Sequence, residues 1–136
     1  MRLFVDTGAL AALSEQSDPH HRRAIGFFAS LPPGTRLATS SLVFAETTTL
    51  LAARFGQDAA IRFGESFVAT RIMSDYYYAN EILERSALIV MRRFRDKRLS
   101  FVDAASIALV KAESLDGVFG FDQDFARCGI PLYPRP

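Results

Sequence analysis

The chain has 136 residues, 49% hydrophobic and 23% charged, so we expect one soluble globular domain over residues 1–136 and exclude disordered and fibrous classes. The formal net charge of +1 does not by itself indicate a nucleic-acid or membrane partner, and no apolar stretch approaches the roughly 20 residues of a membrane-spanning helix. The single cysteine, Cys128, cannot form an internal disulfide and no signal-peptide pattern is visible, which predicts a cytoplasmic protein.

The N-terminal part of the chain predicts one strand and two helices. Residues 3–5 are apolar and indicate a buried strand that runs directly into Asp6. A turn signal follows, and residues 8–14 then carry apolar side chains at helical spacing. Asp18 and Pro19 predict the N-cap and first turn of a second helix, which ends before Pro32.

The next segment predicts a strand followed by two helices. A short strand at residues 36–38 leads into Thr-Ser-Ser at 39–41, a sequence typical of a helix N-cap. The helix that begins there carries Glu46 on the same side as its apolar residues. Gly56 interrupts the pattern, and a further helix is expected over residues 59–70.

Residues 71–98 predict a strand and a long helix. Residues 71–73 are a candidate strand, and Ser74 or Asp75 is expected to cap a helix that ends in the basic run 92–98. The cations of this run suit the negative end of a helix dipole and are usually solvated, which we favour, although they are also candidates for contacting phosphates. Three consecutive tyrosines, 76–78, are expected in the core or at an interface, with stacking on a base as the alternative.

The C-terminal part predicts a capped helix, a strand and short final elements. Ser100 is expected to cap a helix over residues 101–112, and a turn leads to a strand at 118–121. Residues 122–127 predict a short helical turn, and 131–133 a last strand or tail. Because helices separate the strands, the expected fold class is α/β: a three-layer α/β/α sandwich with a central parallel sheet.

Four acids are predicted to meet at one edge of this sheet. Asp6 and Asp122 each follow an apolar strand, while Glu46 and Asp103 lie in the first turns of helices that begin at the same edge. In open α/β sheets the carboxyl edge is where ligands bind. Each acid also has a simpler interpretation. Asp6 can be a turn residue and Glu46 a solvated helix residue, while Asp103 can belong to a capping box and Asp122 can be an N-cap. Asp124 is a second candidate for the role of Asp122.

Several carboxylates within a few ångströms of one another repel strongly. Two charges about 4 Å apart cost roughly 4 kcal/mol at an effective dielectric of 20. A divalent cation removes this cost, and with only oxygen ligands it should be a hard ion, Mg²⁺ or Mn²⁺. Such an ion polarises a phosphoryl oxygen and activates a water molecule, so the pattern predicts phosphodiester hydrolysis. The adjacent His20 and His21 point in different directions along a helix and are expected at the surface.

Four short motifs resemble, in order and spacing, the PIN domain, and in particular the toxin ribonucleases of bacterial VapBC toxin–antitoxin pairs. The motifs are FVDT at 4–7, SSLVFAE at 40–46, LSFVDAA at 99–105 and FDQDF at 121–125. The resemblance implies a Mg²⁺- or Mn²⁺-dependent endoribonuclease that acts on RNA, forms a homodimer and is inhibited by an antitoxin that blocks the acidic pocket. The family often has Thr or Ser two residues before the fourth acid, where this chain has Gly120.

The resemblance also implies a set of site residues. The conserved acids of the family correspond to Asp6, Glu46, Asp103 and Asp122, with Thr7 as a supporting hydroxyl. Our hypothesis is that Asp6 and Asp103 contact the metal, that Asp122 is a direct or water-mediated ligand, and that Glu46 holds a metal-bound water or accepts a proton.

Two other functions remain open at this point. The first is a Mg²⁺-dependent phosphotransfer or phosphatase domain, which also places acids at strand ends, but residues 6–8 lack the second aspartate of haloacid-dehalogenase-type phosphatases. The second is a non-catalytic module that keeps the fold and binds a partner through its acidic pocket.

Overall fold

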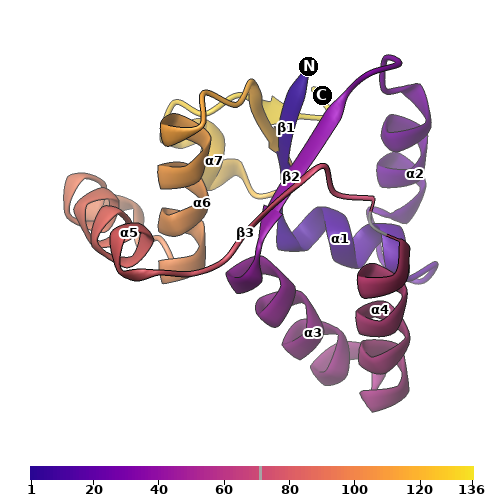
Figure 1. The fold of residues 1–136 in the computed structure, drawn as a ribbon. Helices are drawn as coiled ribbons and strands as arrows, with labels where there is room; N and C mark the ends of the chain where they lie inside the picture. Colours follow the sequence, from indigo (N-terminus) through magenta and orange to yellow (C-terminus); the bar gives the residue numbers. More distant parts are fainter. Residues whose placement is uncertain (71) are drawn as a thin grey trace.

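The computed structural model describes residues 1–70 and 72–136 (Figure 1). The strands are β1 (Arg2–Val5), β2 (Arg36–Ser40), β3 (Asp75–Tyr77), β4 (Gly117–Phe119) and β5 (Leu132–Tyr133). The helices are α1 (Thr7–Ser14), α2 (His21–Ser30), α3 (Ser41–Phe55), α4 (Gln57–Thr70), α5 (Glu81–Arg93), α6 (Phe101–Ala112) and α7 (Gln123–Arg127), with a 3-10 turn, η1, at Arg95–Lys97.

The five strands form one parallel sheet in the order β3-β2-β1-β4-β5. The central strand β1 pairs with β2 and β4, and its Leu3, Phe4 and Val5 are fully buried, as is usual for a parallel strand covered on both faces. Figure 1 shows α5 and α6 on one side of the strands and α1 to α4 on the other. The predicted three-layer α/β/α sandwich with a parallel sheet is therefore confirmed.

The alternation of side chains along the strands decides which helices they contact. Val5, Leu37 and Phe119 face the layer of α1, α2 and α4, where they help to line a cavity of about 490 Å³. Phe27 of α2 meets Phe119 edge to face, with ring centroids 4.8 Å apart. Among the described residues, no helix is both long enough and apolar enough to span a bilayer.

The strand expected at residues 71–73 is wrong, and so is the helix cap expected at Ser74 or Asp75. The strand of this region is β3, which pairs with β2 so that Asp75 lies beside Ala38. The carboxylate of Asp75 pairs with the guanidinium of Arg36 at 3.0 Å and is therefore not available as a cap. Asn80 caps α5 instead, through a 2.8 Å bond from the amide of Leu83 to its side-chain oxygen. Arg71 lies outside the described residues.

The second helix also begins later than the sequence predicts. Asp18 is buried, and its carboxylate accepts a 2.8 Å hydrogen bond from the amide of His20. This bond between a side chain and the backbone two residues on forms an Asx turn, so α2 starts at His21 after the turn. The fourth strand was expected at residues 118–121, but β4 spans Gly117–Phe119 and is therefore shorter.

Candidate active site

Asp6 occupies the carboxyl end of the central strand and is buried at the centre of the site. It is the N-cap residue of α1, but its side chain makes no capping hydrogen bond and is only 5% exposed. Its Oδ1 atom is buried without any hydrogen-bond partner among the described residues. A buried polar atom without a partner is costly, and native proteins rarely keep one unless a ligand, ion or water satisfies it.

The environment of Asp6 disfavours its charged form. The pKa of this carboxyl is raised from 3.8 to about 7, mainly by burial and also by the negative charges of Asp103 and Glu46, against the lowering effect of the nearby backbone amides of Thr7 and Gly8. The electrostatic influence of Asp103 and Glu46 means that both acids lie near Asp6. The structure thus brings Asp103 and Glu46 into the neighbourhood of Asp6, while their assignment as site residues stays a prediction.

Glu46 lies on α3, at the border between its buried and exposed sides. Ser40 caps this helix by accepting a 3.2 Å hydrogen bond from the amide of Val43. Glu46 itself is half-buried, and its Oε1 accepts a 2.6 Å hydrogen bond from the hydroxyl of Thr7. Burial raises the pKa of Glu46, the Thr7 bond lowers it, and the charges of Asp103 and Asp122 raise it. Thr7 therefore connects the end of β1 to this acid.

Asp103 is both a capping residue and a neighbour of the other acids. Its amide donates a 3.0 Å hydrogen bond to the hydroxyl of Ser100, and its Oδ2 accepts a 3.2 Å bond from the amide of Ser100. This is the capping box that the sequence suggested as a simpler interpretation. Burial nevertheless raises the pKa of Asp103, the bonds with Ser100 lower it, and the charges of Asp122 and Asp124 raise it. The capping box thus orients the carboxylate at the edge of the site.

Asp122 and Asp124 form the exposed side of the site. Asp122 is the N-cap of α7, and its Oδ1 accepts a 2.9 Å hydrogen bond from the amide of Asp124. Asp124 is partly exposed and pairs with Arg127 at 2.7 Å. Both acids act electrostatically on Asp103, so both are near it. Arg127 already pairs with Asp124, whereas among the described residues the side chain of Asp122 has only a backbone partner.

Gly120 packs directly against Asp6. A β-carbon at position 120 would lie 3.2 Å from the Cβ of Asp6, 3.6 Å from its Oδ2 and 3.3 Å from Cγ1 of Val118. The distances of 3.2 and 3.3 Å are shorter than most contacts of real β-carbons, whereas 3.6 Å is an ordinary contact. The glycine therefore leaves room for the side chain of Asp6, and the departure from the family pattern at this position has a steric consequence.

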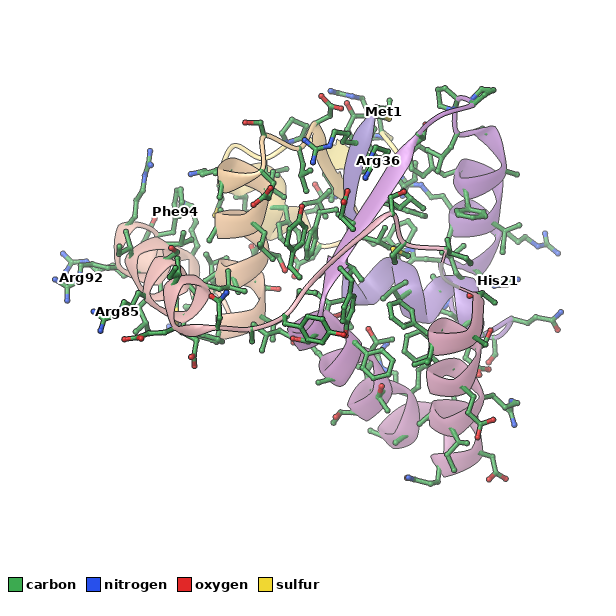
Figure 2. The ribbon with its side chains drawn as sticks, viewed as in Figure 1. Met1, His21, Arg36, Arg85, Arg92 and Phe94 are labelled. Atoms are coloured by element: carbon green, nitrogen blue, oxygen red, sulfur yellow. The ribbon has the colours of Figure 1, made fainter. Side chains whose placement is uncertain are left out.

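The remaining candidates from the sequence are not part of the group of acids. His20 is exposed, and the Nδ1 of His21 lies 2.7 Å from the carbonyl oxygen of Ala12, so the two rings are used separately. Figure 2 shows Arg92 pointing away from the body of the protein at the end of α5. The sequence did not indicate Phe121, whose ring stacks on His20 beside the acids; its only signal was an aromatic residue immediately before Asp122.

The donor set fits a hard divalent cation through a small number of direct contacts. Every candidate ligand is a carboxylate oxygen, and the partnerless Oδ1 of Asp6 supplies one that is not already bonded. Within the described part of the chain, no three Asp, Glu, His or Cys side chains are close enough to hold an ion together. An ion here would keep water molecules in its remaining positions, as Mg²⁺ commonly does.

The sequence of this chain is similar to those of known proteins along most of its length. Residues 3–130 match the sequence profile of the PIN domain. A relative from Mycobacterium tuberculosis, the 23S rRNA-specific endonuclease VapC20, is 35% identical over 128 residues, which cover 94% of this chain and 95% of that protein. A VapC ribonuclease from Archaeoglobus fulgidus is 31% identical over 118 residues, 85% of this chain and 72% of that protein.

Solved structures give the same result for the fold. The crystal structure of Mycobacterium tuberculosis VapC20, described as a toxin that cleaves the sarcin–ricin loop, superimposes with a TM-score of 0.85 at 32% identity. The match covers 95% of this chain and 96% of that one. FitAcB from Neisseria gonorrhoeae superimposes with a TM-score of 0.73 at 15% identity, covering 98% and 96% of the two chains, and shows the fold alone.

Proposed function

Because the chain belongs to the PIN domain family, we propose that it is a Mg²⁺- or Mn²⁺-dependent endoribonuclease and the toxin of a type II toxin–antitoxin pair. Its homology to VapC endonucleases along nearly the whole chain supports the reaction class. The observation that carries the proposal is the buried Oδ1 of Asp6, which has no partner among the described residues and lies near acids whose charges raise the pKa of Asp6. A buried, ionised carboxylate destabilises the fold when no cation is near it, and a bound cation both removes this cost and can take part in the reaction.

The proposed roles follow from where each carboxylate lies. Asp6 and Asp103 would hold the metal, and Asp122 would contact it directly or through water. A divalent ion held there would supply Lewis-acid chemistry for phosphodiester hydrolysis, polarising a phosphoryl oxygen and activating a water molecule. Glu46 is oriented by the 2.6 Å bond from Thr7 and would act as the proton acceptor for the attacking water. Since Glu46 needs its charged form for this step, the Thr7 bond, which lowers its pKa, favours the reaction.

Ribosomal RNA is the first substrate class to test. VapC20 is named for specificity toward 23S rRNA, and its structure is described as that of a toxin that cleaves the sarcin–ricin loop. We extend this to the present chain as a proposal, together with action in the cytoplasm and inhibition by an antitoxin that occupies the acidic pocket.

Besides the complex with an antitoxin, we propose that the chain forms a homodimer through the outer face of α5. Ile82, Leu88 and Ile89 are 77%, 58% and 69% exposed there. Acidic residues lie at the start of this helix and Arg92 and Arg93 at its end, so two antiparallel copies would place opposite charges side by side. Figure 2 shows Arg85 pointing outward from the same helix.

Ile89→Lys should give a monomer in light scattering, whereas Val68→Lys, at an equally exposed position, should leave a dimer.

Metal-dependent cleavage by charge-neutral variants tests the proposed activity. Asp6→Asn and Asp103→Asn should each cut an rRNA fragment at least about a hundredfold more slowly than the unmodified chain, since both remove a charge from the proposed ion. Asp58→Asn, an exposed acid in the first turn of α4, is the matched control and should retain activity. EDTA should abolish cleavage, and Mg²⁺ or Mn²⁺ should restore it. Cleavage by folded Asp6→Asn at the unmodified rate would reject the assignment.

A further inference from the structure

A second feature at the same edge of the sheet is an exposed stack of planar side chains. The imidazole of His20 lies on the ring of Phe121, with centroids 4.3 Å apart and planes within 5° of parallel. The guanidinium of Arg23, one helical turn further along, lies 5.7 Å from the centroid of the same ring. His20 and Arg23 are exposed and Phe121 is half-buried. The three side chains form a surface that we call the His20 stack.

The His20 stack lies beside the acids. Phe121 directly precedes Asp122 and directly follows Gly120, which packs against Asp6. A β-carbon on Gly8, in the first turn of α1, would lie 3.9 Å from the amide nitrogen of Phe121. The ring is therefore held between the start of α1 and the start of α7, close to both Asp6 and Asp122.

Several contacts hold this surface in place before any ligand binds. Phe121 meets Phe119 of the sheet edge to face, with ring centroids 6.5 Å apart. The amide of His20 bonds to the buried carboxylate of Asp18, and this bond positions the residue at the start of α2. Arg23 donates hydrogen bonds of 3.2 and 3.4 Å to the carbonyl oxygens of Pro134 and Arg135. A ring fixed in this way loses little conformational freedom when a ligand stacks on it.

The chemistry of the His20 stack suits an unpaired nucleobase. Proteins recognise single-stranded RNA by stacking splayed bases on aromatic rings, histidines and arginine guanidinium groups. The four neighbouring acids repel phosphate groups, so a substrate needs favourable contacts next to the pocket. The permanently charged Arg23 and the outer face of His20 provide a cation and a flat surface there.

We propose that the His20 stack is a nucleotide subsite in which a base next to the scissile phosphodiester stacks on the imidazole of His20. This inference rests on the proposed ribonuclease function and adds to it a residue that contacts the substrate outside the acidic motifs. His20 acts through binding, and its replacement raises KM more than it lowers kcat.

Binding of RNA to a cleavage-deficient background measures this subsite directly. The probe is a fluorescein-labelled, single-stranded RNA of mixed sequence, followed by anisotropy with Asp6→Asn as the parent protein. His20→Ala should weaken binding about tenfold, because base–aromatic stacking contributes on this scale. His20→Phe keeps a flat ring and should bind within about twofold of the parent. Arg22→Ala, an exposed neighbour outside the stack, is the control for local changes in α2.

An abasic RNA series separates stacking from a structural effect. Removing one base at a time should identify a position at which His20→Ala no longer matters, because the base that it contacts is already missing. If His20→Ala lowers the melting temperature, His20→Leu keeps an apolar cover on Phe121 and should show the same loss of affinity. Equal affinity of the parent and His20→Ala, or a loss that no abasic position removes, would overturn the proposal.

Cleavage by the chain with all acids intact distinguishes failure of the nucleotide subsite from failure of the ribonuclease function. If it cleaves RNA with Mg²⁺ and His20→Ala has the same KM, the subsite is wrong while the ribonuclease function stands. If the unmodified chain cleaves no RNA, the proposed function fails and the subsite fails with it.

Discussion

Asp6 and Asp122 follow adjacent strands of the same sheet, and each is the N-cap residue of the next helix. Their environments are nevertheless opposite. Asp122 is exposed and its Oδ1 accepts a hydrogen bond from the amide of Asp124, whereas Asp6 is buried and its Oδ1 has no partner in the described part of the chain. The comparison shows that position in the chain does not determine what such an acid does. Burial decides whether its oxygen is used by the fold or remains available for an ion.

The two acids should therefore contribute differently to stability and to activity. The fold is stabilised by the hydrogen bond of Asp122 to the start of α7, a common contribution of about 1 kcal/mol. Asp6 makes no such bond and carries an electrostatic cost when ionised. The experiments below test this contrast, beginning with the largest expected effect.

The ion-free protein should lose stability as the pH rises from about 4 to about 7. Because the pKa of Asp6 rises from 3.8 to about 7 on folding, the folded state binds more protons than the unfolded state in this range. The loss is complete above pH 7 and amounts to at most about 4 kcal/mol, at about 1.4 kcal/mol per pH unit. Glu46 and Asp103 act in the same direction. Urea unfolding in EDTA from pH 4.5 to 8 measures the slope.

Asp6→Asn should flatten this profile, because the substituted amide does not ionise. Mg²⁺ should raise the melting temperature of the unmodified protein more at pH 8 than at pH 5, and should have little effect on Asp6→Asn. Asp122→Asn, at the exposed acid, should leave the slope almost unchanged. An equally steep profile in Asp6→Asn would show that burial of this carboxyl is not its origin.

The parts of the fold that depend on local signals could be predicted from the sequence. Ser40 and Ser100 cap their helices as expected, since capping involves residues only three apart. The edge strand β3 was misplaced because its pairing with β2 and the ion pair between Arg36 and Asp75 depend on residues far apart in the chain. An aspartate before a helix has the same local pattern whether it caps that helix or pairs with an arginine.

The site shows the same division. Parallel strands bring their carboxyl ends to one edge, so the approach of Asp6 to Asp103 and Glu46 could be inferred from the order of strands and helices. The extent of burial at Asp6 could not, because Gly120 and the surrounding elements determine it. The stack of His20 on Phe121 was also unpredictable, since an Asx turn near one end of the chain meets a residue near the other.

Gly120→Ala should disturb the buried acid and so transmit a small steric change to the site. The added carbon would lie 3.2 Å from the Cβ of Asp6, and overpacking of this kind costs about 1–3 kcal/mol. We expect a lower free energy of unfolding and a severalfold loss of RNA cleavage. Gly26→Ala in the exposed part of α2 is the control, because a β-carbon there meets no atom within 4 Å. Similar results for both variants would mean that the contact with Asp6 has no effect.

Thr7→Val should remove the hydrogen bond to Glu46 while preserving the shape of the side chain. It removes the hydroxyl that donates to Glu46, and such bonds to charged groups contribute about 1.5–3 kcal/mol in other proteins. Because this bond lowers the pKa of Glu46, its loss should move the acidic limb of the pH–rate profile to higher pH. Thr7→Ser keeps the hydroxyl and should keep the profile of the unmodified protein. An unshifted acidic limb in Thr7→Val would exclude Glu46 as the proton acceptor.

The smallest effects on stability are expected for substitutions of Asp122 and Asp124. A change in the activity of these variants can therefore be attributed to the site and not to unfolding. Asparagine is as good an N-cap as aspartate, so Asp122→Asn should change the free energy of unfolding by less than about 0.5 kcal/mol. Asp124→Asn loses only its partly exposed pair with Arg127, which contributes about 0–1 kcal/mol. We expect Asp122→Asn to reduce cleavage and to raise the Mg²⁺ concentration needed for half-maximal rate, because its carboxylate lacks a cationic partner. Asp124→Asn should do neither, since Arg127 already neutralises that charge, and the reverse order of effects would assign the metal contact to Asp124.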